Sequence, residues 1–200
     1  MATFNVHHPL VVGDFGHYID NDVMDAVMSP NVIGASPWIH VATTSEATAL
    51  VYLNHVNSSH VTFVAMNPRT RSLVLPVCVG ESSDGVWSGH YVVLHVNLMS
   101  RIAILHDSIA GTQSFDEITK KLANITNNIW GSHVLPCRLV LGSSDHQVAL
   151  SNDCGVFCFR NVCAIVSCAH VMPFLGGVDF VGSFDFICRD VFRSIVASLP

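Results

Sequence analysis

The sequence predicts an α+β domain in which helices at both ends of the chain surround a central group of strands. Half of the 200 residues are hydrophobic, which is enough to bury one substantial core. Amphipathic helical patterns occur near both ends, and short runs rich in β-branched residues lie between them. No internal repeat or low-complexity linker divides the chain, so we expect residues 1–200 to form a single domain.

The first half of the chain predicts one helix, an ambiguous segment and two strands. The stretch YIDNDVMDAVM, 18–28, has apolar residues at helical spacing behind Asp20 or Asn21 as possible caps. Residues 47–56, ATALVYLNHV, fit a helix and a strand equally well. VTFVAM, 61–66, and SLVLPVCV, 72–79, are short and β-branched and are predicted strands.

The second half predicts a hairpin, two further helices with a strand between them, and a closing helix. ESSDGVWSG, 81–89, is a predicted loop, and HYVVLHVNLMSRIAILHDS, 90–108, is a predicted hairpin. An amphipathic helix follows at 115–130 and a strand at 134–141. The last two predicted helices begin at Cys154 and at Phe184.

The hairpin brings a histidine and an aspartate together if its turn is centred on Leu98-Met99. Paired residue numbers then sum to 197, which places His90 directly opposite Asp107. Directly opposed residues have Cβ atoms about 5 Å apart, so the carboxylate could accept the imidazole N–H and fix the tautomer. Such a pair is the base and orienting acid that a nucleophilic cysteine requires, and an ordinary polar histidine at a strand edge is the alternative.

Cys154 stands where the stretch SNDCGVFCFRNV enters an apolar helix. The N–H groups and the positive end of the dipole at a helix start favour a thiolate over a thiol, so a nucleophile is one interpretation of this placement. Core packing and metal binding are the alternatives. The spacing of Cys154 and the cysteines at 158, 163 and 168 favours thiols packed on one helix face, and no Cys-x-x-Cys pair occurs. We therefore expect neither a metal nor a cofactor.

Gln147 lies seven residues before Cys154, in SDHQVALSNDCG. A side-chain amide there could join the backbone N–H of Cys154 as a donor to an oxyanion. An exposed loop residue is the alternative interpretation of Gln147.

Composition excludes several classes of function. The net charge is -6 and the chain has only two lysines, so no basic patch for nucleic acid or an anionic membrane is expected. The most apolar window, 162–177, contains His170 and Pro173 and is too short to span a bilayer comfortably. The N-terminus lacks a secretory pattern, which predicts free cysteines and an intracellular location in cytoplasm or nucleus.

The order His90, Asp107, Gln147, Cys154, with DCG opening an apolar helix, resembles the Ulp/SENP-type SUMO proteases and the related adenovirus-type protease. YIDNDVMDAV resembles the first-helix motif of that family, LVLPVCV the strand before its histidine, and AILHDS the strand that ends in its aspartate. The resemblance implies a papain-like cysteine protease fold of the Ulp/adenain type, a central mixed sheet flanked by helices. It makes Cys154 the nucleophile, His90 the base, Asp107 the orienter and Gln147 an oxyanion donor.

Two positions depart from the SUMO-protease pattern. Tyr18 and Tyr91 stand where that family has tryptophans walling a tunnel for a Gly-Gly tail, and the seven-residue spacing from Gln147 to Cys154 is closer to the adenovirus-type enzyme. The resemblance implies a cysteine protease or isopeptidase that cleaves after a small-residue, Gly-Gly-like tail. Its protein substrate would be a ubiquitin-like protein, its conjugate or a polyprotein.

Three alternatives keep the same fold. A viral or mobile-element protease of adenovirus type would process a polyprotein. A YopJ-like acetyltransferase would need a basic pocket for an inositol phosphate, which is hard to build from nine Lys and Arg residues. An inactive binding module would retain the fold without turnover, and the complete set of triad positions argues against it.

Overall fold

The structure is a computed structural model, and it describes most of the chain between residues 19 and 171. The described residues are 19–34, 36–54, 68–80, 82–83, 86–87, 89–109, 113–142, 144, 147 and 153–171. The predicted strand 61–66, the predicted closing helix 184–199 and Tyr18 lie outside them.

A five-stranded mixed sheet forms the centre of the fold, in the order β1-β2-β5-β6-β7. Its strands are β1 (Ile39–Val41), β2 (Ser72–Val79), β5 (His90–Asn97), β6 (Ile102–His106) and β7 (Arg138–Leu141). The two outer pairs, β1 with β2 and β6 with β7, are parallel, whereas β2, β5 and β6 are antiparallel neighbours. The predicted α+β class, with its central mixed sheet, is confirmed.

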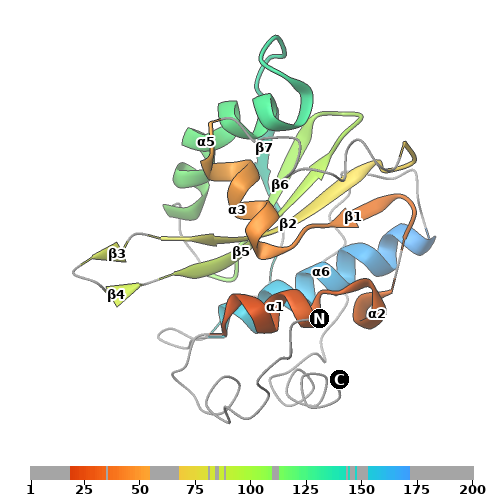
Figure 1. The fold of residues 1–200 in the computed structure, drawn as a ribbon, viewed down its shortest axis with the longest axis vertical. Helices are drawn as coiled ribbons and strands as arrows, with labels where there is room; N and C mark the ends of the chain where they lie inside the picture. Colours follow the sequence, from red (N-terminus) through yellow and green to blue (C-terminus); the bar gives the residue numbers. More distant parts are fainter. Residues whose placement is uncertain are drawn as a thin grey trace.

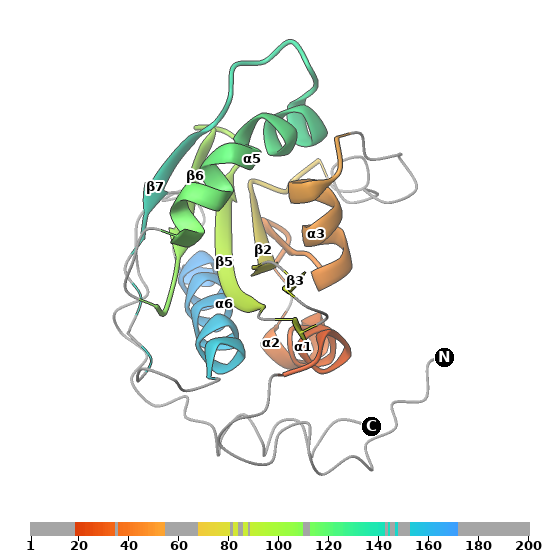
Figure 2. The same cartoon turned by 90° about the vertical axis from the view of Figure 1, so that its left-hand side faces the viewer.

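Helices cover both faces of the sheet and create two separate cores. On one face α3 (Thr44–Tyr52) and α5 (Gln113–Trp130) pack over β2 and β5, around Leu50, Leu94 and Ile118. On the other face α1 (Asn21–Val27) and α6 (Cys154–Val171) pack against Val93, and a short helix, α2 (Pro30–Ile33), follows α1. Figure 1 shows α3 and α5 above the sheet with α1 and α6 below it, and Figure 2 shows α3 and α6 on opposite sides of β5.

Local hydrogen bonds explain where the first helices start. Asp20 caps α1 by accepting the Asp22 N–H at 3.1 Å, so the first of the two candidate caps is the one used. The ambiguous segment becomes helix α3 because Thr43 and Glu46 form a reciprocal capping box just before it. The predicted loop 81–89 is more regular than expected, since Ser82–Ser83 (β3) and Val86–Trp87 (β4) pair as a small antiparallel ribbon.

The predicted register of the β5–β6 hairpin is wrong by two residues. Val93 pairs with His106 and Asn97 with Ile102, so paired numbers sum to 199 and not to 197. The turn contains four residues, 98–101, because the side-chain oxygen of Asn97 accepts the N–H groups of Met99 and Ser100, and Arg101 adopts a φ of 55°. His90 and Asp107 are therefore not directly opposed.

Two buried histidines lie on neighbouring strands of this hairpin. His95 of β5 is 7% exposed and His106 of β6 is 2% exposed. Burial, together with the neighbouring His106, lowers the pKa of His95 to about 4, so His95 is neutral in the folded protein at neutral pH.

The remaining predicted elements within the described residues form, although the predicted strand 134–141 is shorter and covers only Arg138–Leu141. The amphipathic helix is α5, the strand after it is β7, and the apolar helix that begins at Cys154 is α6. None of the described helices combines the length and the apolar composition needed to cross a bilayer.

Candidate active site

Cys154 is the first residue of α6 and belongs to the core between that helix and the sheet. It is 3% exposed and packs with Ile19 and Tyr91, among others. The next residue must be small, since a Cβ on Gly155 would lie 2.8 Å from Cδ1 of Ile19. Gly155 thus lets the segment before α1 lie directly against the start of α6, which fixes where the thiol stands.

His90 and Asp107 form a short hydrogen bond despite the shifted register. The imidazole Nε2 lies 2.6 Å from Oδ1 of Asp107, and both side chains are largely buried. Extending the observed register places Asp107 opposite Val92, so His90 is a diagonal neighbour, within reach of a long side chain. Asp107 lies just past the end of β6, where its carboxylate can turn toward the start of β5.

The environment of His90 favours the imidazolium. Burial lowers the pKa of His90, but hydrogen bonds to Asp107 and Cys154 and the charges of both groups outweigh it and raise this pKa to about 9. Because Nε2 is engaged by Asp107, Nδ1 is the ring nitrogen that can serve the Cys154 thiol. The three side chains thus have the connectivity of a nucleophile, a base and an orienting acid.

Several donors hold Asp107 in its ionised form. Burial acts to raise the pKa of this carboxyl, but hydrogen bonds from His90, the Ile109 N–H and the Ser114 hydroxyl keep it below the usual value. The Ile109 N–H lies 2.8 Å from Oδ1, the oxygen that also contacts His90. Asp107 therefore cannot rotate away from the imidazole without losing a backbone hydrogen bond.

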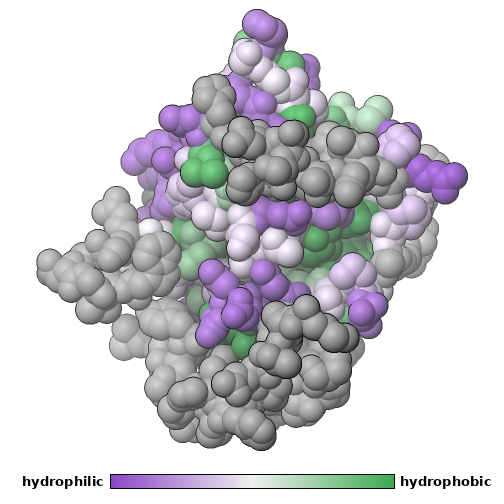
Figure 3. All heavy atoms as spheres, in the orientation of Figure 1, coloured by the Kyte–Doolittle hydropathy of each residue, from purple (hydrophilic) through white to green (hydrophobic). Residues whose placement is uncertain are grey.

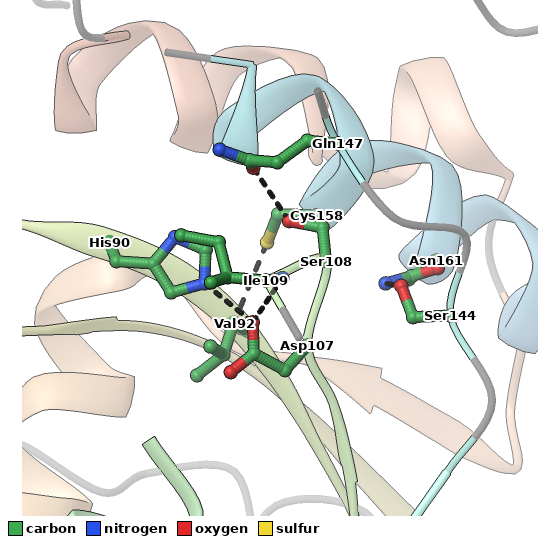
Figure 4. A network of polar contacts seen from close by, with 9 residues as sticks. All are labelled: His90, Val92, Asp107, Ser108, Ile109, Ser144, Gln147, Cys158 and Asn161. Carbon is green, nitrogen blue, oxygen red and sulfur yellow. Dashed lines mark hydrogen bonds and ion pairs between the residues drawn. The ribbon is translucent and has the colours of Figure 1, made fainter. Parts of the chain in front are cut away.

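Gln147 is bound to the residue that follows Asp107. Its backbone N–H donates to the Ser108 carbonyl at 2.9 Å, and its side-chain Oε1 accepts the Ser108 hydroxyl at 2.8 Å. Figure 4 shows His90, Asp107, Ser108 and Gln147 grouped beside α6. Gln147 is thus anchored next to the His90–Asp107 pair.

The other described thiols of α6 are held in the protonated form. Cys158 is buried and donates to the Val92 carbonyl at 3.8 Å, and burial raises its pKa well above the usual value. Burial also raises the pKa of Cys163 to about 12. Both cysteines pack with the core between α6 and the sheet, as their helical spacing predicts.

A cleft of about 660 Å³ opens beside Tyr91, between the start of α1, α3 and the ends of β2 and β5. Its lining residues are Ile19, Asp20, Asn21, Thr48, Tyr52, Cys78, Gly80, Gly89 and Tyr91. The Tyr91 hydroxyl donates to the side-chain oxygen of Asn21, which holds the ring against the cleft. Figure 3 shows hydrophobic surface recessed above the hydrophilic side chains around α1.

The structure brings together five of the six residues singled out in the sequence. His90 contacts Asp107 and Cys154, and Tyr91 packs in the same core as Cys154. Sequence reasoning missed Ser108, and it missed Thr48 and Tyr52 in the cleft. Gly80, which has a φ of 134°, and Gly89 were available signals, since glycines at facing strand ends are typical where a backbone must approach closely.

Comparisons with known proteins show a likeness in structure only. No family model and no curated protein matches the sequence. A solved structure of the SUMO protease Ulp1 with its catalytic cysteine oxidised to a sulfonic acid is 14% identical, with a TM-score of 0.64 over 90% of this chain and 76% of that one. The Ulp1 protease domain in complex with Smt3, the yeast ortholog of SUMO, is 12% identical, with a TM-score of 0.60 over 90% and 77%.

A bacterial effector has the same architecture. XopD of Xanthomonas campestris, solved bound to ubiquitin, is 12% identical, with a TM-score of 0.60 over 90% of both chains. At these identities the likeness shows the fold. The chain has the Ulp-type cysteine protease fold, as its sequence resemblance implies.

The site predicts unequal reactivity of two equally buried thiols. Cys154, beside His90 and at a helix start, should react with iodoacetamide at neutral pH at least tenfold faster than Cys158, on the order expected for a thiolate beside an imidazolium. Mass spectrometry of timed samples measures both rates in one protein, and His90→Ala should reduce the difference. Equal rates at the two cysteines would contradict the assignment of Cys154.

The His90–Asp107 bond predicts a pH effect that needs no substrate. Asp107→Asn should lower the pKa of His90 from about 9 toward its usual value, because it removes the charge that stabilises the imidazolium. NMR titration of the His90 ring measures this. Because the pKa of His90 is higher in the folded protein than in the unfolded chain, protonation of His90 stabilises the fold. This contribution is fully present at pH values below the usual histidine pKa, and it is lost as the pH rises through about 9. The free energy of unfolding should therefore fall over that window less in Asp107→Asn than in wild type, and an unchanged His90 pKa would refute the coupling.

Proposed function

We propose that this protein is a cysteine protease or isopeptidase that cleaves after the Gly-Gly-like tail of a ubiquitin-like protein. The 2.6 Å bond from His90 to Asp107, next to Cys154 at the start of α6, carries the proposal. The Ulp-type fold supports it, because the described neighbours with that fold are SUMO proteases and a ubiquitin-bound effector. We propose an intracellular location, where cysteines remain reduced.

In the first half of the reaction the Cys154 thiolate attacks the scissile carbonyl. The S–C bond forms while the carbonyl π electrons move to oxygen, and the side-chain amide of Gln147 and the backbone N–H of Cys154 donate to that oxyanion. The Cys154 N–H suits this role because the first N–H groups of a helix have no acceptor within it. The intermediate then collapses, the C–N bond breaks, and His90 gives its proton to the leaving amine.

In the second half water releases the acyl group. Neutral His90 takes a proton from water as the oxygen attacks the thioester, and the C–S bond then breaks to regenerate the thiolate and imidazolium. Asp107 stays ionised throughout and holds the ring by Nε2, so Nδ1 exchanges every proton. No other group is required for this cycle.

The cleft beside Tyr91 would hold the tail of the substrate. Tyr91 is 5% exposed and its hydroxyl is bound to Asn21, so the ring is a fixed wall. A β-carbon on the tail would collide with a fixed aromatic wall close to the sulfur, whereas glycine passes. Tyr18 remains a predicted second wall, since it lies outside the described residues.

Reactive probes test the proposed function directly. Ubiquitin-like proteins carrying a C-terminal electrophile, with SUMO and ubiquitin as separate arms, should form a covalent adduct with wild-type protein and none with Cys154→Ala. An intact Cys158 makes that variant a matched control for nonspecific alkylation. An adduct in the SUMO or the ubiquitin arm alone identifies the substrate. Failure of every arm, with iodoacetamide still labelling Cys154 selectively, would reject the ubiquitin-like substrate but not the nucleophile.

Tyr91 predicts a specific tolerance at the positions before the cleaved bond. Tyrosine is smaller than tryptophan, so wild-type protein should accept alanine in place of glycine with a loss in kcat/KM of about tenfold, on the order of 1.4 kcal/mol. Tyr91→Trp should increase that loss, and Tyr91→Phe, which frees the ring from Asn21, should reduce it. A profile over peptides varied at these two positions measures the effect. A preference for bulky or basic residues at these two positions would contradict the proposed role of Tyr91 as a wall of the cleft.

A further inference from the structure

Ser108 lies between the His90–Asp107 pair and Gln147, and it has no role in the mechanism above. It follows Asp107 in the chain, and its hydroxyl donates to Oε1 of Gln147 at 2.8 Å. Its side chain is 2% exposed, so water cannot readily replace that partner. Among the residues that the structure describes, Gln147 is the only side-chain partner of this hydroxyl.

The direction of this hydrogen bond fixes the orientation of the Gln147 amide. A side-chain amide carries an acceptor and a donor group at its two ends, and a rotation of 180° exchanges them. In the observed orientation the Ser108 O–H is satisfied, and the NH2 group lies on the opposite side of the amide from Ser108. Rotation would place two potential donors face to face or leave the buried hydroxyl proton without an acceptor, which is unfavourable.

The orientation of the Gln147 amide matters because an oxyanion accepts hydrogen bonds from N–H groups and is repelled by a carbonyl oxygen. An amide that presents Nε2 stabilises the transition state, whereas one that presents Oε1 destabilises it. The backbone is held separately, since the Gln147 N–H donates to the Ser108 carbonyl at 2.9 Å. Loss of the hydroxyl alone would therefore remove this constraint on the amide without displacing the Gln147 backbone.

We infer that Ser108 is a positioning residue that holds the Gln147 amide with its N–H groups toward the developing oxyanion. The inference rests on the proposed function for its catalytic consequence. One short segment, formed by Asp107, Ser108 and Ile109, then orients both the imidazole of His90 and the amide of Gln147. Ile109 and Asp107 fix the imidazole, and Ser108 fixes the oxyanion donor.

A double-mutant cycle tests the catalytic consequence with a Gly-Gly peptide amide as substrate. Ser108→Ala should lower kcat on the order of tenfold with KM within about twofold, because the amide helps only in the transition state. In a Gln147→Ala background the same change should have little further effect. An equal loss of kcat in both backgrounds would overturn the inference, since Ser108 would then act independently of Gln147.

Ser144→Ala is the matched control, because it removes another serine that pairs with an amide. The Ser144 Oγ accepts the Asn161 side-chain N–H at 3.2 Å, away from the catalytic groups. This variant should leave kcat unchanged. Ser108→Thr, which keeps the hydroxyl, should restore at least part of the activity lost in Ser108→Ala.

NMR of the side-chain amides gives a readout that needs no substrate. The ¹H–¹⁵N pair of Gln147, assigned by its absence in Gln147→Ala, should move or broaden in Ser108→Ala and stay in place in Ser144→Ala. The Asn161 pair should show the reverse. An unchanged Gln147 signal in Ser108→Ala would overturn this inference. Wild-type protein that is inactive on every substrate would instead overturn the proposed function. The NMR result would in that case still test whether Ser108 orients the Gln147 amide.

Discussion

The antiparallel pairing of β5 with β6 is the constraint on which the candidate site depends. It sets where the two strands end relative to each other, and His90 starts one strand while Asp107 follows the other. A shift of one residue in this pairing would turn every side chain on β6 to the opposite face and would separate the two groups. The four-residue turn held by Asn97 maintains the pairing, so a polar contact at one end of the hairpin determines the chemistry possible at the other.

The site is rigid because its members belong to the core or are bonded to it. Cys154 and Tyr91 are buried in the core between α6 and the sheet, which also contains Met24 of α1 and Ile19, two residues before that helix. Gly155 allows the contact between α6 and Ile19, while Asn21 holds the Tyr91 hydroxyl. Cys154 and Tyr91 therefore share one support, the first turn of α1 together with Ile19, which lies two residues before that helix.

Much of the architecture could be predicted from the sequence because periodicity and caps are local. The helix at Cys154 and the strand 72–79 are long enough for their residue patterns to identify the type of secondary structure. The segment 47–56 was ambiguous because its deciding signal, the Thr43–Glu46 capping box, lies just upstream. The His90–Asp107 contact was expected for the wrong reason: the pairing is diagonal, and the turn is longer because Asn97 bonds two backbone N–H groups. Ser108 could not be found, because its partner is 39 residues away and no pattern specifies that approach.

His95, buried in the sheet, makes the fold less stable in acid, independently of any chemistry at the candidate site. His95 is neutral in the native protein with a pKa of about 4, whereas in an unfolded chain it takes up a proton near pH 6.5. The unfolded state therefore binds more protons between these values, and this contribution to stability is lost as pH falls through that range. Asp107, whose pKa is held low, would still be ionised there. Acidification would thus weaken the scaffold before it neutralised the Asp107 carboxylate, so the sheet itself favours neutral conditions for folding.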